Sequence, residues 1–246
     1  MEFSRFETAA YDGETVGDVA YRRIRSDIVN GRLPPVEKLK LDTLKTTYNV
    51  SVTTLREILN RLAVEELVTA EGQRGFRVAP ISAAELQELA DLRVLLECHA
   101  LEKSIRHGDL DWEADVVSAH YKLSVIEAAL LEGQPSAVER WVRHDWGFHH
   151  AMISACNTRA MMRTHSSIFD RYMRYHMLVL DFRGRPVADD HQRLRDLVLA
   201  RDVDGAVALL TRHVQSGVDY ILGTGRIPRT EAGALKPPAS PARPVA

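Results

Sequence analysis

The stretch that decides the fold runs from residue 50 to residue 78 and reads VSVTTLREILNRLAVEELVTAEGQRGFRV. Its first part predicts a helix, because Ser51 can cap a helix N-terminus and the apolar residues after it recur at helical spacing. These apolar residues are Leu55, Ile58, Leu59 and Leu62. The opposite face carries short polar groups and a guanidinium, which suit phosphates and the base edges of a major groove. The residues of this polar face are Thr53, Thr54, Arg56 and Asn60.

Shorter elements flank this helix on both sides. Before it, spaced apolar residues predict a short helix, and Asn49 lies where the chain must turn between two crossing helices. The apolar residues of the short helix are Leu39, Leu41, Leu44 and Tyr48. After the central helix, residues 67–70 and 76–79 read as two strands joined by the Gly-containing basic segment 71–75. Taken alone, the central helix would more often be an ordinary surface helix, but the ordered series predicts a winged helix-turn-helix, a DNA-binding module.

This part of the chain resembles the DNA-binding domain of the GntR family of bacterial transcription regulators. Three segments carry the resemblance. They are Gly31-Arg32-Leu33-Pro34-Pro35, Val50-Ser51-Val52-Thr53-Thr54-Leu55-Arg56-Glu57-Ile58-Leu59 and Arg74-Gly75-Phe76-Arg77-Val78. In the family, such segments lead into the motif, form the recognition helix and form the wing, respectively. The resemblance therefore implies a regulator that binds operator DNA.

The same resemblance implies a set of DNA contacts. The threonines and the arginine of the recognition helix would touch DNA, and Gly75 would let the wing tip approach the minor groove. Two departures lower the expected positive charge, since Val52 stands where family members usually carry Arg and Asp42 where a basic residue is common. Nearby basic residues, Arg77 among them, would make up this loss. The residues expected to bind DNA are Lys45, Ser51, Thr53, Thr54, Arg56, Arg61, Arg74 and Gly75.

Length and charge indicate two domains. A chain of 246 residues with 45% hydrophobic content can form two compact units, each with its own core. Residues 17–80 hold 11 Lys and Arg against 8 Asp and Glu, whereas residues 81–246 hold 20 against 22. The basic bias of the first unit is consistent with phosphate binding. We expect a disordered N-terminus over 1–16, a DNA-binding domain over 17–80, a second domain over 81–222 and a disordered tail over 223–246.

The second domain is predicted to be an antiparallel helical bundle. Pro80 ends the last wing strand, and Ser82 can cap the next helix with Glu85 at the position of a capping box. Six amphipathic segments follow, over residues 82–107, 111–132, 135–155, 158–182, 188–201 and 203–222. The expected fold class is mainly α, a winged helix-turn-helix with a two-stranded wing followed by an all-α bundle that can hold a ligand or metal between its helices.

Cysteine usage and hydropathy bear on the location of the protein. Cys98 and Cys156 form no spaced metal motif, and the sequence contains no signal peptide and no long apolar span. We therefore expect a cytoplasmic protein that does not associate with a membrane.

A second group of residues in the bundle indicates metal binding. Asp145 and His149 are four residues apart on one predicted helix, so their side chains project from the same face and can chelate one ion. His191 and His213 lie on the two last helices and would complete the set if these helices pack beside the first. Oxygen and nitrogen ligands suit zinc, nickel, manganese or iron, with zinc expected first. Taken singly, such an Asp and His pair is more often a surface or capping pair.

The helical part resembles the FCD ligand-binding domain, which follows the DNA-binding domain in the FadR subgroup of the GntR family, across residues 83–220. Members that bind metal share an Asp-x-x-Phe-His-like motif and two later histidines. Here the motif is Asp145-Trp146-Gly147-Phe148-His149, and His191 and His213 fall at the later positions. The resemblance thus implies that Asp145, His149, His191 and His213 are metal ligands.

Two further positions are expected to bind an effector. Arg93 and Glu97 match an Arg-x-x-x-Glu feature of the first bundle helix, and Arg93 could pair with an effector carboxylate or simply with Glu97 one turn away. Asn157 matches an Asn common at its turn, where it would cap the next helix or reach the pocket.

Together these features predict a dimeric regulator, most simply a repressor of a catabolic operon, that binds a palindromic operator and is controlled by a small carboxylate bound at the metal. Two alternatives stay open. The metal site could belong to an enzyme, although no catalytic Ser or Cys motif, phosphate loop or His-Glu-x-x-His pattern accompanies it. The metal could also be purely structural within a dimerisation domain.

Overall fold

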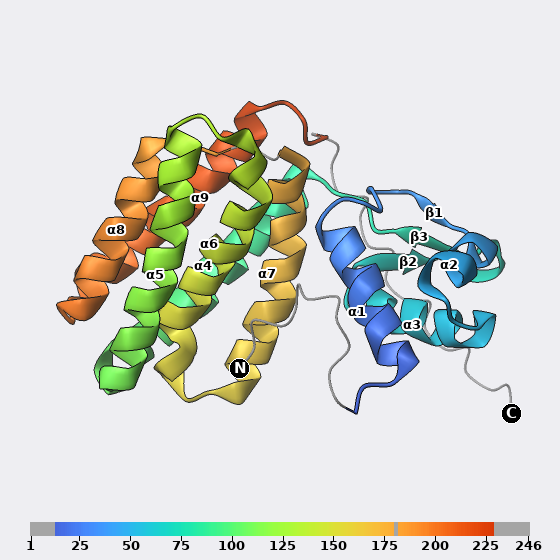
Figure 1. Ribbon diagram of the computed structural model, residues 1–246, viewed down its shortest axis with the longest axis horizontal. Helices are drawn as coiled ribbons and strands as arrows, with labels where there is room; N and C mark the ends of the chain where they lie inside the picture. The colour runs from blue at the N-terminus through green and yellow to red at the C-terminus, as the bar shows by residue number, and fades with distance from the viewer. Residues whose placement is uncertain (1–12, 180–181, 229–246) are drawn as a thin grey trace, which may run out of the picture.

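The computed structural model describes residues 13–179 and 182–228 and has two domains (Figure 1). The first contains helices α1 (Val16–Val29), α2 (Leu41–Tyr48) and α3 (Val52–Val64). Asn49 adopts the left-handed conformation, with φ of 53°, and turns the chain from α2 into α3. Ser51 caps α3 by accepting a hydrogen bond from the Thr54 backbone N–H. The apolar face of α3 predicted from the sequence is the buried one.

The wing is a three-stranded antiparallel sheet. Its strands are β1 (Lys38–Leu39), β2 (Val68–Ala70) and β3 (Phe76–Val78), in the order β1-β3-β2. Arg77 of β3 faces Lys38 on one side and Thr69 on the other. The expected two-stranded wing thus gains a third strand, because β1 is only two residues long and too short to show an alternating pattern. A short 3₁₀ helix, η2 (Gly72–Arg74), forms the tip between β2 and β3.

The second domain consists of six α-helices within the residues that the structure describes. They are α4 (Ala83–His107), α5 (Leu110–Leu131), α6 (Val138–Ile153), α7 (Arg159–Val179), α8 (Arg185–Leu199) and α9 (Val203–Gly223). The 3₁₀ turns η3 (Pro135–Ala137) and η4 (Ser154–Cys156) lie at either end of α6, where the sequence indicated one continuous helix. Helix α8 starts three residues earlier than expected because Pro186, read as a separator, lies in its first turn, where proline is tolerated. The fold class expected from the sequence is confirmed.

Helix α4 has one face buried in the bundle and one face exposed. It packs against α6, α7 and α9, while α5 packs against α6 and α8 (Figure 1). Ser82 caps the helix as expected, since it accepts a hydrogen bond from the Glu85 N–H. The expected capping box does not form, because the Ser82 N–H donates to the Tyr175 hydroxyl and the Glu85 carboxylate accepts from Arg171 and Tyr175. Side chains from α6, α8 and α9 therefore reach a common interior beside α4. No helix in the described part of the chain is both long enough and apolar enough to cross a membrane.

The domain ends differ from the expected boundaries. Thr15 forms a capping box with Asp18 and starts α1 at Val16, inside the segment 1–16 that was expected to be disordered. At the other end, the chain continues past Gly223 and packs on the bundle. Ile227 is buried, and the Pro228 carbonyl accepts a hydrogen bond from the Ala83 N–H at 3.1 Å. The rest of both expected disordered segments, residues 1–12 and 229–246, lies outside the described residues.

Candidate functional site

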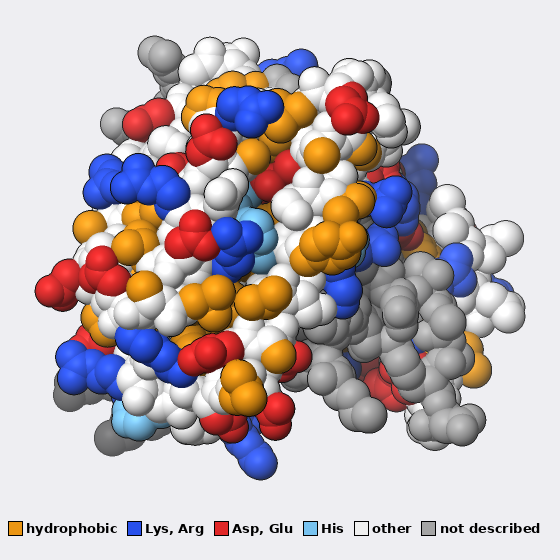
Figure 2. All heavy atoms as spheres, turned by 60° about the vertical axis from the view of Figure 1, so that its left-hand side comes forward, with side chains coloured by type: hydrophobic (Ala, Val, Ile, Leu, Met, Phe, Trp, Pro, Cys, Tyr) orange, Lys and Arg blue, Asp and Glu red, His pale blue; other side chains and the backbone are white. Residues whose placement is uncertain are grey.

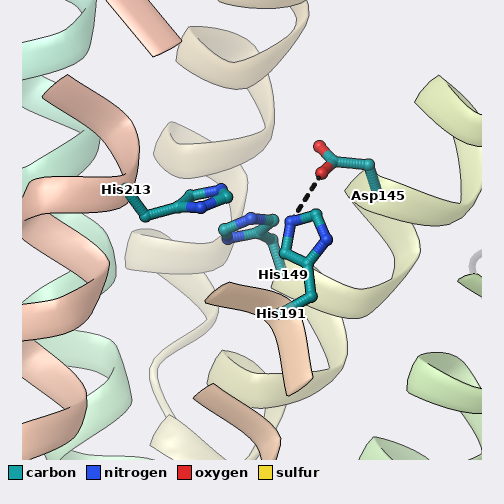
Figure 3. Close-up of side chains that lie close together, drawn as sticks. All are labelled: Asp145, His149, His191 and His213. Carbon is teal, nitrogen blue, oxygen red and sulfur yellow. Dashed lines mark ion pairs between the residues drawn. The ribbon is translucent and has the colours of Figure 1, made fainter. Parts of the chain in front are cut away.

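A buried cluster of one carboxylate and three imidazoles lies inside the bundle. Asp145 and His149 come from α6, His191 from α8 and His213 from α9 (Figure 3). One potential ligand atom from each residue lies within 4.8 Å of those of all the others. The structure therefore brings together the four residues that the sequence singled out as metal ligands.

The protonation of the cluster suits metal coordination at two of the histidines. Burial lowers the pKa of His149, as does the nearby Arg93 guanidinium, and burial holds the pKa of His213 well below its ordinary value. Both imidazoles are therefore neutral near pH 7 and have a lone pair to offer.

His191 and Asp145 form a charged pair in the absence of an ion. Burial alone would lower the pKa of His191, but its contacts with Asp145 and Glu127 raise it to about 9. Burial would likewise raise the pKa of Asp145, but His191 and the nearby His149 and Arg93 hold it below its ordinary value. His191 Nε2 lies 3.1 Å from Asp145 Oδ1, without the alignment of a hydrogen bond. A divalent cation would take the place of the proton between these two groups.

The donor set fits such a cation. Nε2 of His149 and Nε2 of His191 are buried and have no hydrogen-bond partner. Buried polar atoms are ordinarily satisfied, so two such nitrogens beside a carboxylate need an explanation. Three imidazoles and one carboxylate are the ligand types of zinc, nickel and non-haem iron sites. A metal ion would satisfy both nitrogens at once.

A small enclosed cavity borders the cluster. Arg93 is buried there, with its Nε 2.6 Å from Glu97 Oε1, so the ion pair considered from the sequence is present and Arg93 also faces the cluster. His176 and Arg183, which were not predicted from the sequence, line the same cavity. Burial lowers the pKa of His176 to about 3, so this imidazole is neutral. The lining residues are Arg93, Trp141, Asp145, Tyr172, His176, Arg183, His213 and Val214.

Asn157 lies elsewhere. It adopts the left-handed conformation, with φ of 55°, in the turn between η4 and α7. It lines an open cavity with Ser154 and Arg159, apart from the cavity that contains Arg93. The structure thus does not bring together the two residues expected to bind effector, because Asn157 lies in the turn before α7 and does not line the cavity at Arg93.

The polar face of α3 is exposed on the first domain. Thr53, Arg56 and, on α2, Lys45 are exposed, as is Arg74 at the wing tip. Ser51 and Thr54 bond each other, with 2.9 Å between their hydroxyl oxygens. Gly75 has φ of 95°, a conformation that a residue with a side chain rarely adopts. These residues remain the candidate contacts for DNA.

Two of the basic residues near these candidate contacts are held by other groups. The Arg61 guanidinium lies 3.7 Å from the ring centre of Tyr21 on α1, and 3.9 Å separates its Nε from Glu65 Oε1. Arg77 is bound by Glu71 and by the Val36 carbonyl. Lys45, Arg56 and Arg74 are therefore the remaining basic candidates for phosphate and base contacts.

The helical domain has no comparable basic surface on the face brought forward in Figure 2. Basic and acidic side chains alternate over that face, where α5 and α8 lie. Such a mixed surface does not attract a phosphate backbone as a basic patch does.

Comparison with known proteins identifies both domains. Residues 17–78 match the family described as bacterial regulatory proteins, gntR family, and residues 88–216 match the FCD domain. The HTH-type transcriptional regulator BphR of Paraburkholderia xenovorans (strain LB400) is 36% identical over 83% of this chain and 84% of its own length. The HTH-type transcriptional repressor GlaR of Escherichia coli (strain K12) is 32% identical over 82% of this chain and 93% of its own.

Two solved structures share the fold. McbR/YncC of E. coli has a TM-score of 0.73 at 17% identity, covering 86% of this chain and 99% of that one. A GntR transcriptional regulator from Rhodococcus sp. RHA1 has a TM-score of 0.69 at 23% identity, covering 84% and 97%. These families and relatives are transcription regulators and not enzymes, which removes the enzyme alternative. The chain belongs to the GntR family of bacterial transcription regulators, with the DNA-binding and FCD domains that characterise its FadR subgroup.

Proposed function

We propose that this regulator is a repressor whose affinity for operator DNA is controlled by a small carboxylate bound at a metal ion in the FCD domain. The observation that carries the proposal is the buried cluster of Asp145, His149, His191 and His213, with two histidine nitrogens that have no hydrogen-bond partner. Zinc is the first candidate, and nickel, manganese or iron also suit these ligands. The relative GlaR is named a repressor, which supports repression rather than activation for this protein.

The effector site is proposed beside the cluster. An ion that accepts five or six ligands retains positions for a carboxylate after binding four protein groups. Arg93 and Arg183 border the cavity next to Asp145 and His213, and a guanidinium can bind a carboxylate through two parallel hydrogen bonds. The proposed ligand is therefore a small organic acid, bound by the metal at one end and by arginine at the other.

Helix α7 offers a route from this pocket to the DNA-binding domain. On one side of the helix, the rings of Phe169 and Tyr172 lie 4.6 Å and 4.9 Å from the Arg93 guanidinium carbon. Between these two residues in sequence, Asp170 forms a buried ion pair with Arg25 of α1. A movement of Arg93 toward a bound acid would therefore act on a helical turn that also holds the first domain.

The next residue of this turn, Arg171, strengthens the connection. Its guanidinium lies 2.8 Å from Glu66, two residues after the end of the recognition helix, and 2.6 Å from Glu85 in the first turn of α4. Arg171 thus joins the end of the recognition helix to the helix that carries Arg93. We propose that effector binding changes the placement of the recognition helix through this turn of α7.

A homodimer and a palindromic operator complete the proposal. Regulators of this family bind operator DNA and are typically dimers. A two-fold dimer places two recognition helices in successive major grooves, so its operator repeats the half-site in inverted orientation. Light scattering of the purified protein, alone and with operator, measures the number of chains directly.

The direct test is a DNA-binding titration of the zinc-loaded protein with a panel of mono- and dicarboxylates. The DNA is the segment upstream of the regulator's own gene. We expect one acid to change operator affinity about 5- to 150-fold, the range of typical allosteric coupling. If the protein binds the DNA and no acid changes the affinity, the sensor proposal is wrong although DNA binding stands.

A structural metal is the second candidate, and the burial of the site favours it. His149 and His191 are fully buried and His213 is 2% exposed, so an ion here could serve the core alone. Melting temperature separates the two roles, because an organic acid that binds the native protein raises it, whereas a purely structural ion leaves no site for the acid.

A further inference from the structure

Each of the three histidines of the cluster has a carboxylate oxygen within hydrogen-bond distance of its Nδ1. Nδ1 of His149 lies 3.2 Å from Glu97 Oε2, and Nδ1 of His191 lies 2.6 Å from Glu127 Oε1. Nδ1 of His213 lies 3.4 Å from Asp190 Oδ2. The three acidic residues come from α4, α5 and α8, so three different helices supply them.

These contacts all involve the same ring nitrogen. A carboxylate accepts a hydrogen bond, so each Nδ1 must carry a proton. A neutral ring then keeps its lone pair on Nε2, and the protonated His191 would release its Nε2 proton when an ion binds. Nε2 of His149 and Nε2 of His191 are buried and have no hydrogen-bond partner, as is also true of His120 Nε2 and His165 Nδ1 outside the cluster. Buried polar atoms are ordinarily hydrogen-bonded. The nitrogens of His149 and His191 differ from those of His120 and His165 because their residues belong to a group of four potential metal ligands.

We infer that Glu97, Glu127 and Asp190 are positioning residues that fix the tautomer and orientation of the metal ligands, so that all three histidines bind the ion through Nε2. The inference rests on the proposed metal site and adds three residues that set its affinity. A carboxylate behind an imidazole holds the ring in place and makes its other nitrogen a stronger donor. Residues of this kind are thus part of the metal site without touching the ion.

Glu127 is the best placed of the three for a test. Its side chain is buried, accepts the short contact from His191, and lies 3.3 Å from Trp141 Nε1. Glu97 is less suitable because it also holds Arg93 at 2.6 Å and His165 at 2.8 Å, so its replacement would disturb several groups. Asp190 provides an independent test at the edge of the site, where its side chain is 31% exposed and a substitution is well tolerated.

The experiment measures zinc affinity by competition with a chelating indicator. The variants Glu127→Gln and Asp190→Asn keep the size of the side chain and remove its charge. Their matched controls are Glu132→Gln, at the residue directly after the end of α5, and Asp189→Asn, next to Asp190. Both control residues are exposed. The metal-free melting temperature of each variant shows whether the fold is intact.

We expect Glu127→Gln to weaken zinc binding about 10- to 100-fold and Asp190→Asn to weaken it less, with both controls close to the original protein. Equal zinc affinity in the original protein, Glu127→Gln and Asp190→Asn would overturn the inference and leave the metal site standing. An original protein that binds no zinc would instead overturn the proposed metal site itself.

A second measurement does not depend on variants. Nitrogen-15 NMR of the labelled, zinc-loaded protein distinguishes a metal-bound ring nitrogen from a protonated one. We expect a proton on Nδ1 and zinc on Nε2 in all three histidines. Zinc on Nδ1 of any of them would contradict the inference, because that nitrogen would then not donate to its carboxylate.

Discussion

At the scale of single residues, Arg56 is the arginine of the recognition helix whose guanidinium does not pack on another helix. Arg56 is exposed on α3, whereas Arg61 on the same helix lies over the Tyr21 ring. The loss of the usual Arg at Val52 leaves fewer groups to read base edges. Arg56 should therefore contribute most of the specific contact.

Replacing this guanidinium tests the recognition helix. Arg56→Ala should lower operator affinity by about 1 to 3 kcal/mol, the value of one good base contact, and should reduce the preference for operator over unrelated DNA. Fluorescence anisotropy with labelled operator measures both quantities. Arg106→Ala, at the exposed end of α4, removes the same charge far from α3 and is the control. An affinity unchanged by Arg56→Ala would mean that α3 does not read the operator.

The metal ligands can be tested individually as well. His213→Ala should remove most of the bound metal, because only three of the four protein ligands remain to coordinate the ion. His144, next to Asp145, does not belong to the cluster, so His144→Ala should retain the metal. Elemental analysis of purified protein gives the ratio of metal to chain. Equal metal content in the two variants would show that the ion binds elsewhere.

Some residues of the metal site could be predicted from the sequence and others could not. Asp145 and His149 could be paired from their spacing alone, because residues four apart share a helix face. His191 and His213 needed the family resemblance, since nothing in their own sequence segments brings them near α6. Glu127, Asp190 and Arg183 could not be connected to the site, because only the packing of α5, α8 and the α7–α8 turn against the cluster places them there.

At the scale of elements, helix α7 is the connection between the two domains. One of its turns contacts Arg93 through Phe169 and Tyr172 and contacts the first domain through Asp170 and Arg171. The sequence predicted α7 as a helix but gave no sign of its double role, since both sets of contacts depend on tertiary packing. The third wing strand was missed for a related reason, because β1 is defined by its partner β3 and not by its own pattern.

Breaking the connection at Arg171 should uncouple the domains. Arg171→Ala should leave zinc and operator affinity nearly unchanged and reduce the effector-induced change in operator affinity by about 0.5 to 2 kcal/mol. Arg159→Ala, at the first residue of α7, is the control on the same helix. Titration of operator with and without effector measures the coupling. A full response in Arg171→Ala would show that the signal travels by another route.

At the scale of the whole molecule, the sequence predicted the two-domain architecture and its family well, because helical periodicity and the winged motif are local features. The domain ends were less predictable, as the residues after α9 pack against the start of α4 through Pro228 and Ala83. The charge of the whole chain is uninformative, since a net charge of −2 conceals the basic bias of the DNA-binding domain.

Metal removal should lower the stability of the whole protein. An ion bound by four buried side chains stabilises the folded state by its binding free energy, so chelation should lower the melting temperature. For the metal-loaded protein, an effector at 100 times its dissociation constant should add about 2.7 kcal/mol of stability. Differential scanning calorimetry with and without chelator and acid checks both effects. A melting temperature that does not respond to chelation would contradict a metal site in the core.

Control of DNA binding by a metal-bound acid is tested by comparing operator affinity in four states: zinc-loaded or metal-free protein, each with and without the effector acid. We predict that the acid changes affinity about 5- to 150-fold in the zinc-loaded protein and has no effect in the metal-free protein. An equal response in the two forms, or no response in either, would contradict the claim that a metal-bound acid controls DNA binding.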